Sequence, residues 1–248
     1  MSNTILTVQN ISSTSKQRMV GLFAALITVF IWASYALSLR IGALTPLTLV
    51  ELSFFRYAVP GLLLLPIFIK SFKDYTNVPP IYLLGIVFGS GVPFFLLSGF
   101  GMQLTQVAYG STLIPGTIPL FVTLIAVLVY KQPLPIFRQW GILVICSGVI
   151  IMLVHAGSSW DENLLIGQGL FLLSAFLWSL FTISIRQSGL SPLQVAALAA
   201  FPNGVIITFW ILLTAPELGY TALPISALIG QVLVQGVIVG VFSGVCFS

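Results

Sequence analysis

Two charged side chains lie inside a long apolar stretch of the sequence. Glu51 and Arg56 fall within residues 47–69, which carry no other charge. Charges are costly in hydrocarbon, so such residues are first considered as functional groups. Arg56 is a candidate substrate contact and Glu51 a candidate proton carrier. Because their spacing is five residues, not the three or four that favours an ion pair on one helix, Arg56 has an alternative structural role, in which it bonds helix carbonyls or reaches lipid headgroups.

Five further side chains are candidates for lining a binding pocket. Trp32 and Trp178 lie about 12 residues into their apolar stretches, which is too deep for the aromatic belt at a membrane surface. They either line a central cavity from matching positions or pack where two parts of the chain meet. The position on the expected helices adds Tyr35, Phe94 and Gln235.

The sequence offers little for other chemistry. His155 is the only histidine, and Cys146 and Cys246 both sit in apolar runs, where cysteine usually acts as a small buried hydrophobe. There is no set of metal ligands, no nucleophile next to a base and no phosphate-binding loop. We therefore expect neither an enzyme nor an ATP-driven pump, with no cofactor, no metal and no nucleic-acid partner.

The composition places the chain in a lipid bilayer. Hydrophobic residues make up 58% of the sequence and charged residues 6%, whereas a soluble domain carries roughly a quarter charged residues. Backbone groups in hydrocarbon need internal partners, so only helices or closed barrels cross a membrane. The apolar runs are continuous and do not alternate with period two, so the sequence predicts an all-α, multi-pass bundle of transmembrane helices.

Eight helices are expected, because a span needs roughly 20 apolar residues. The uncharged stretch 81–130 is too long for one span, so we divide it into two helices with a turn near residues 99–106. The other spans are expected at 20–41, 47–69, 137–155, 166–185, 193–213 and 223–247.

Basic residues predict the orientation of these spans. With the N-terminus in the cytoplasm, the cytoplasmic segments hold seven of the basic residues, Lys16, Arg18, Lys70, Lys73, Lys131, Arg138 and Arg186, whereas the outer ones hold Arg40. Cytoplasmic loops carry an excess of Lys and Arg. We therefore expect a cytoplasmic N-terminal tail over residues 1–19.

The chain contains an internal repeat. Trp32, Arg40 and Pro46 recur 146 residues later as Trp178, Arg186 and Pro192. We assign residues 20–156 to the first copy and 165–248 to the second. The two copies start five spans apart, and because five is odd, they cross the membrane in opposite directions. Inverted repeats are typical of secondary transporters, whose binding site lies between the two halves.

The second copy is shorter than the first in this register. Gly91 and Val92 recur as Gly236 and Val237, 145 residues later, so the last residue, Ser248, matches a point near Gln103, at the end of the third span of the first copy. The repeat therefore predicts that the ninth and tenth spans are missing, and that the chain is a truncated product or a fragment that is inactive or poorly stable.

Polar and helix-breaking residues gather in the third, fourth, seventh and eighth spans, for example Pro93, Pro202, Asn203 and Gln231. Proline leaves a backbone carbonyl free, so we expect cavities or hinges there, or else static kinks. Small residues at Gly236, Gly240 and Gly244 recur every four positions. This spacing favours close helix packing, and a homodimer through this stripe is an alternative use.

The chain resembles the EamA-type ten-helix transporters of the drug/metabolite transporter superfamily over residues 20–248. The resemblance rests on Trp32, residues 46–56, Pro119, residues 141–148 and the second copy, which starts at Gly167. It implies an inner-membrane carrier, commonly an exporter of small metabolites, amino acids or drugs. One departure is the sequence Tyr-Lys-Gln-Pro at 130–133, where the family often has a turn similar to Gly-Glu-Arg.

Together, these observations predict a secondary carrier that moves a small organic solute by alternating access. A lipid scramblase and a non-transporting subunit of a membrane assembly remain alternatives. A scramblase needs a polar groove open to lipid, whereas a carrier needs an enclosed polar pocket.

Overall fold

The computed structural model describes residues 15–43, 45–158, 161–214 and 217–243, and the regular elements there are all helical. In the first part of the chain these are α1 (Ser15–Ala43), α2 (Leu49–Leu63), α3 (Leu65–Lys70), α4 (Phe72–Thr76), α5 (Pro80–Gly89), α6 (Val92–Leu104), α7 (Val107–Leu128) and α8 (Ile136–Ser158). The second part has α9 (Glu162–Ser188), α10 (Pro192–Thr214), the 3₁₀-helix η1 (Gly219–Ala222), α11 (Ile225–Gln231) and the π-helix η2 (Val232–Ser243). The predicted all-α architecture is confirmed.

Six helical segments of the described residues are long and apolar enough to cross a membrane, against eight predicted spans. The difference lies in the first two. In α1 the apolar part is the shorter segment Val29–Gly42. The second predicted span is interrupted at Leu64, between α2 and α3. Pro66 follows within the first turn of α3, and it has no N–H with which to continue the hydrogen bonds of α2.

The third predicted span is also interrupted, between α5 and α6. Gly91 forms the break, and a Cβ there would collide with the carbonyl oxygen of Val87 and with the side-chain amide of Asn203. Pro93 lies in the first turn of α6, where its missing N–H costs nothing. The turn expected between the third and fourth spans lies at Thr105 and Gln106, between α6 and α7.

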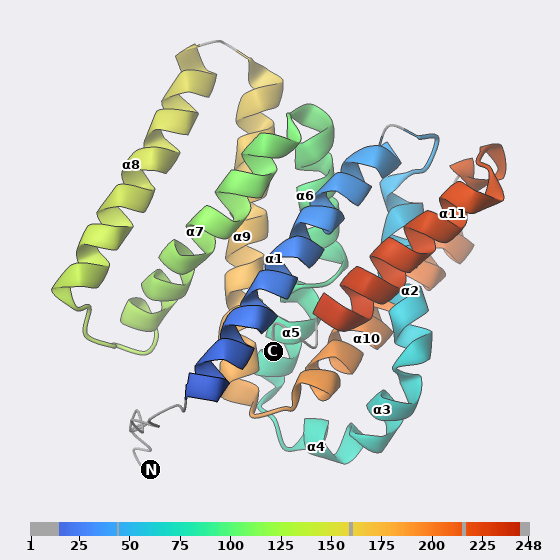
Figure 1. The fold of residues 1–248 in the computed structure, drawn as a ribbon, viewed down its shortest axis with the longest axis horizontal. Coiled ribbons are helices and arrows are strands. Elements are labelled where there is room, and N and C mark those ends of the chain that lie inside the picture. Colours follow the sequence, from blue (N-terminus) through green and yellow to red (C-terminus); the bar gives the residue numbers. More distant parts are fainter. Residues whose placement is uncertain (1–14, 44, 159–160, 215–216, 244–248) are drawn as a thin grey trace.

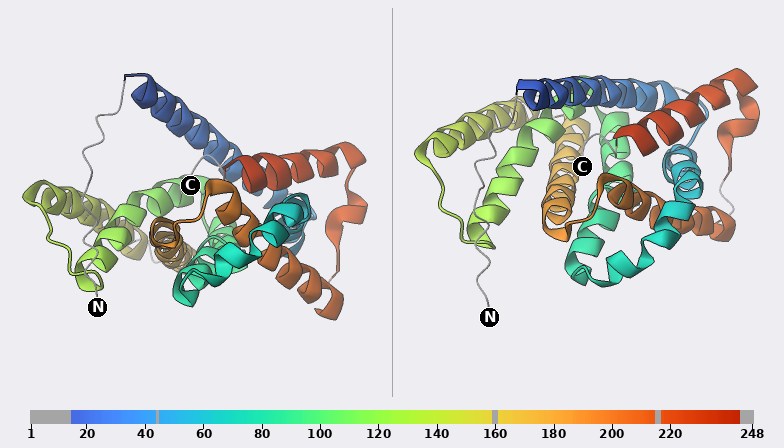
Figure 2. Two further views of the ribbon diagram at one scale, coloured as in Figure 1. Left: turned by 90° about the horizontal axis from the view of Figure 1, so that it is seen from below. Right: turned by 60° about the horizontal axis from the view of Figure 1, so that its bottom comes forward.

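The helices pack around two centres (Figures 1 and 2). In one, α9 is contacted by α5, α6 and α7, and in the other α2 lies between α10 and η2, with α1 against η2. The helix α8 stands at the edge of the bundle, next to α7 and α9. Its apolar segment from Ile136 to Val154 has no buried residue.

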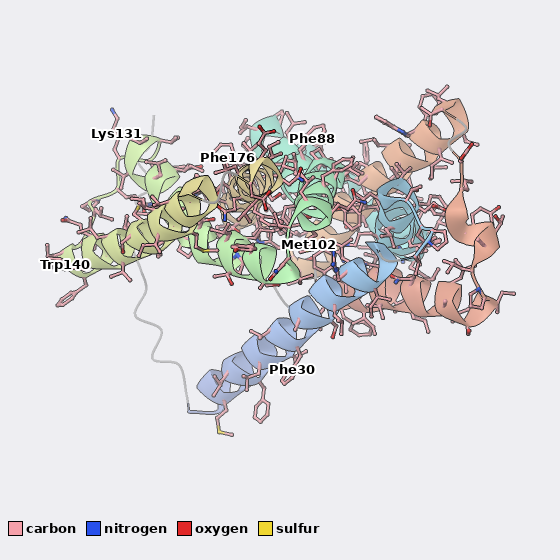
Figure 3. All side chains as sticks on the ribbon, turned by 90° about the horizontal axis from the view of Figure 1, so that it is seen from above. Phe30, Phe88, Met102, Lys131, Trp140 and Phe176 are labelled. Carbon is pink, nitrogen blue, oxygen red and sulfur yellow. The ribbon has the colours of Figure 1, made fainter. Side chains whose placement is uncertain are left out.

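The outer surface is apolar, as the lipid-facing surface of a membrane protein requires. Phe30 on α1 is 73% exposed and Trp140 on α8 is 62% exposed, and both project away from the bundle (Figure 3). Met102, in contrast, is buried at the centre of the bundle. Several helices long enough to span, together with this surface, identify a multi-pass membrane protein.

Candidate functional site

A buried polar cluster joins α1 to α11 and η2. Ser38 donates through Oγ to Gln231 Oε1 at 2.9 Å, and Gln231 Nε2 donates to the carbonyl oxygen of Ser38 at 3.3 Å. Gln235 Nε2 donates to Ser38 Oγ at 3.2 Å. Gln235 is fully buried, and its Oε1 has no hydrogen-bond partner among the described residues. An unpaired acceptor buried in a bundle is costly, so this amide is available to a ligand donor.

The guanidinium of Arg56 lies between two aromatic rings on the inner side of α2. Its Cζ is 5.4 Å from the centroid of the Tyr35 ring and 5.9 Å from that of the Tyr57 ring. Both distances suit cation–π contacts, which strengthen in a desolvated site. The Nη1 atom of Arg56 is buried and has no hydrogen-bond partner in the described part of the chain. The rings thus hold the cation while one of its donors stays open.

The two tyrosines that flank Arg56 reach across to the interrupted span. Tyr35 Oη lies 3.5 Å from Ser98 Oγ on α6, and Tyr57 Oη donates to the carbonyl oxygen of Ser90 at 2.7 Å. The Phe95 ring packs at 6.4 Å from the Tyr35 ring and 6.1 Å from the Tyr57 ring, between centroids. Arg56 is therefore held between rings from α1 and α2, and α6 contacts both of these rings.

The predicted site residues separate into two groups. Tyr35, Arg56 and Gln235 belong to the polar region around α1, α2 and η2, as described above. Phe94 and Trp178 lie together elsewhere, with their ring centroids 4.7 Å apart, on the other side of α6. Trp32 belongs to α1, but its side chain lies outside what the structure describes.

Glu51 is buried and accepts three hydrogen bonds. Its Oε2 accepts from the backbone N–H of Thr48 at 2.7 Å and from the Thr48 hydroxyl at 2.9 Å, while Oε1 accepts from the N–H of Tyr220 at 2.8 Å. The Thr48 hydroxyl in turn accepts from the N–H of Glu51, which completes a capping box at the start of α2. These contacts give the carboxylate a structural role, and its candidacy as a proton carrier stays a prediction.

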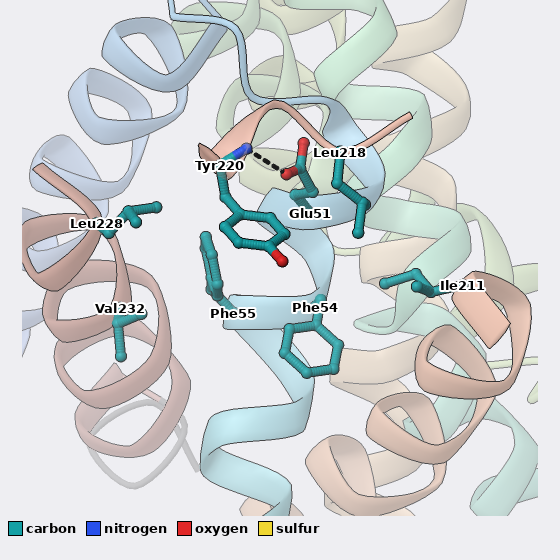
Figure 4. Close-up of a pocket in the computed structure, with 8 residues that line it drawn as sticks. All are labelled: Glu51, Phe54, Phe55, Ile211, Leu218, Tyr220, Leu228 and Val232. Atoms are coloured by element: carbon teal, nitrogen blue, oxygen red, sulfur yellow. Dashed lines mark hydrogen bonds between the residues drawn. The ribbon is translucent and has the colours of Figure 1, made fainter. Parts of the chain in front are cut away.

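A pocket of about 410 Å³ lies beside this carboxylate, between α2, α10, η1, α11 and η2 (Figure 4). The lining residues are Glu51, Phe54, Phe55, Ile211, Leu218, Tyr220, Leu228 and Val232. Its wall is apolar, because the carboxylate of Glu51 turns away toward the N–H of Tyr220. Among the drawn side chains, the Tyr220 hydroxyl is the polar group that points toward the other lining residues (Figure 4).

Four members of the polar region were not among the site residues that the sequence predicted. Ser38, Tyr57, Ser98 and Gln231 enter it through contacts between segments 33 to 193 residues apart. Gln231 was noted in the sequence as a polar residue in an apolar span, and in the structure it belongs to the polar cluster. Serine and tyrosine are common in membrane helices, so only the fold identifies the others.

The stripe of small residues on η2 packs within the chain. A Cβ on Gly236 would meet Val59 Cγ1 at 2.8 Å, and one on Gly240 would meet Pro60 Cγ at 2.7 Å, both on α2. Gly244 lies outside the described residues. The two described glycines thus allow η2 to approach α2 closely.

Comparisons with known proteins place this architecture in a family. The model of the EamA-like transporter family matches residues 19–154, which is more than half of the chain. Comparison with curated proteins and with solved structures gave no match. The family match, the apolar helices and the polar region between them agree, and the chain belongs to the EamA-like transporter family.

Proposed function

We propose that this protein is a secondary carrier that moves a small organic solute across the membrane by alternating access, without ATP. The observation that carries the proposal is the open donor of Arg56, which is held between the Tyr35 and Tyr57 rings and buried within a bundle of membrane helices. Burying a cation inside a membrane protein costs free energy, and such residues typically serve in binding or transport.

The packing supports the proposed inverted repeat. In the predicted repeat, α1 corresponds to α9, α2 to α10, and α5 with α6 to α11 with η2. The helix α1 packs on η2 as α9 packs on α5 and α6, and α2 packs on η2 as α10 packs on α5. Exchange of the two halves thus maps these contacts onto one another, as expected for a carrier with its site between the halves.

The substrate is proposed to carry a carboxylate. A guanidinium pairs well with a carboxylate, often through two parallel hydrogen bonds. The unpaired Oε1 of Gln235 adds an acceptor on the neighbouring η2. We therefore expect an organic acid, with a donor group if it also reaches Gln235.

Ligand-induced thermal stabilisation of the purified protein tests this site. Size-matched carboxylates, amides and amines are compared, each on the wild type, Arg56→Lys and Arg56→Met. We expect at least one carboxylate to raise the melting temperature of the wild type, weakly that of Arg56→Lys, and not that of Arg56→Met. Lysine keeps the charge but loses the planar fork. Equal stabilisation of Arg56→Met and wild type by carboxylates would refute the assignment of Arg56.

The orientation and the location are part of the same proposal. The bias of basic residues supports a cytoplasmic N-terminus in a cell inner membrane, and the resemblance to exporters supports outward movement. A scramblase would instead require a polar groove open to lipid. The described polar side chains that carry the proposal are buried or partly buried, which favours a carrier.

A further inference from the structure

The side chain of Glu51 ties the start of α2 to the segment that follows α10. Glu51 is the third residue of α2, and one of its oxygens closes the capping box with Thr48. The other oxygen accepts from the N–H of Tyr220 in η1 at 2.8 Å (Figure 4). We call the pair of Glu51 and Tyr220 the α2 latch.

The side chain of Gln194 makes the matching connection at the start of α10. Gln194 is the third residue of α10, and its Oε1 accepts from the N–H of Ser191 at 2.9 Å. Its Nε2 donates to Asp74 Oδ2 in α4 at 2.7 Å, and its carbonyl oxygen accepts from Tyr75 Oη at 2.9 Å. Burial raises the pKa of Tyr75 to about 12, so this hydroxyl stays a donor. We call the pair of Asp74 and Gln194 the α10 latch.

The two latches are built alike. In each latch, one side-chain atom of the third helix residue caps the N-terminus of that helix. Another side-chain atom of the same residue binds the segment that follows the partner helix, α10 for the α2 latch and α2 for the α10 latch. The bound residues, Asp74 and Tyr220, are 146 residues apart, which is the spacing of the repeat, whereas the capping residues, Glu51 and Gln194, are 143 apart. Neither polar contact was evident from the sequence, because each joins residues at least 120 positions apart.

The latches lie at opposite ends of one tight helix crossing. A Cβ on Gly61 would meet the backbone of Ala200 and Phe201 at 3.2–3.5 Å, and one on Gly204 would meet the Tyr57 carbonyl oxygen at 2.9 Å. The chains therefore run antiparallel, with the start of α2 beside the end of α10. The two helices could therefore tilt against each other about this close crossing, and the polar contact at each end would limit the movement.

We propose that the α2 latch and the α10 latch are the two gates of the carrier, and that they open alternately about the α2–α10 crossing. With the α10 latch released, the bundle opens at the membrane face where α10 begins. With the α2 latch released, it opens at the face where α2 begins. The proposal rests on alternating access but concerns residues outside the Arg56 site.

Exchanging the two latch side chains tests the gates individually. Gln194→Glu keeps an acceptor for Ser191 but sets a carboxylate against Asp74. Glu51→Gln keeps one acceptor but loses one of the two backbone N–H contacts, to Thr48 or Tyr220. The reporter is Ser98→Cys, a fully buried position on α6, with Cys146 and Cys246 changed to serine. A membrane-impermeant maleimide is added to either side of oriented vesicles, and this readout needs neither a substrate nor transport.

We expect each substitution to raise the labelling rate from one side only, and the two sides to be opposite. Glu51→Gln should raise it about tenfold, because a buried charged hydrogen bond is lost. Gln194→Glu should raise it about threefold, because the α10 latch is exposed and charge effects there are screened. Tyr220→Pro, which removes the N–H donor together with the tyrosine ring, should reproduce Glu51→Gln, whereas Tyr220→Ala, which keeps the N–H, should not.

The matched control is D74N/Q194E, which restores an amide–carboxylate pair with the roles reversed. It should return labelling to the wild-type rate. Labelling that rises equally from both sides, or that stays at the wild-type rate in Glu51→Gln and Tyr220→Pro, would overturn the proposal. Failure of D74N/Q194E to reverse the effect of Gln194→Glu would overturn the α10 gate. Carboxylate stabilisation of the wild type is measured separately, so a failed gate and a failed site are distinguishable.

Discussion

Asn203 is the residue that makes the interruption between α5 and α6 tolerable. Its Oδ1 accepts from the N–H of Val92 at 2.8 Å, and its Nδ2 donates to the carbonyl oxygens of Val87 and Ala199, each at 2.8 Å. Tyr57 Oη donates to a further carbonyl at the break, that of Ser90. Backbone groups freed at membrane depth need such partners. One side chain from each half therefore supports the broken helix.

Replacing Asn203 by alanine should destabilise the protein. The N–H of Val92 and the carbonyl of Val87 would lose their partner in a fully buried place. We expect the free energy of unfolding to fall by about 2 kcal/mol or more, at roughly 1–3 kcal/mol for each unsatisfied group. Thermal unfolding in detergent measures the change.

Thr208→Val is the control for this prediction. Thr208 lies on the same helix and donates to the carbonyl of Gly204 at 2.6 Å, within α10. Its loss leaves no long-range contact unsatisfied and should shift the unfolding temperature little. Equal effects of Asn203→Ala and Thr208→Val would show that Asn203 does not support the break.

At the level of elements, α2 and α10 form the central crossing between the halves. Small residues from both helices, Ala58, Gly61, Ala200 and Gly204, meet there. Helices in lipid associate through close packing rather than through exclusion of water. The contact is therefore sensitive to a single added methyl group, and this sensitivity can be measured.

Gly204→Ala should weaken the crossing. The new Cβ would lie 2.9 Å from the carbonyl oxygen of Tyr57 and 3.0 Å from Cα of Ala58, so the backbones must separate. We expect a loss of about 1–3 kcal/mol in the free energy of unfolding, which is typical of overpacking. The control is Gly169→Ala on α9, where nothing lies within 4 Å, and which should be neutral or stabilise by up to about 1 kcal/mol. A Gly204→Ala variant as stable as this control would contradict the proposed close contact.

The sequence predicted these elements better than their contacts. Hydropathy located six of the eight predicted spans, and the pair Thr48 and Glu51 has the residue types of a capping box. The break at Gly91 was not predicted, because continuous apolar composition hides an interruption whose stability comes from Asn203, more than 100 residues away. The grouping of Tyr35 with Arg56, and of Phe94 with Trp178, also depends on how the helices pack against one another. Helix position alone does not contain that information.

At the level of the whole molecule, the proposed solute site lies where helices of both halves meet. Tyr35 and Arg56 belong to the first predicted repeat and Gln235 to the second, and Gln235 donates to Ser38, which also belongs to the first repeat. A movement of one half against the other would therefore change the site and the two latches together. Alternating access requires such a coupling between the site and the gates. A transport measurement therefore tests the proposal as a whole.

Solute exchange by the purified protein in proteoliposomes tests this account most directly. Vesicles are loaded with a carboxylate identified by thermal stabilisation, and entry of the labelled solute is followed without ATP, with lipid flipping measured in parallel. We predict saturable entry that the same solute on the opposite side accelerates, that Arg56→Met abolishes, and that no lipid flipping accompanies. Entry no faster than in protein-free vesicles, together with rapid lipid flipping, would contradict the carrier and favour a scramblase.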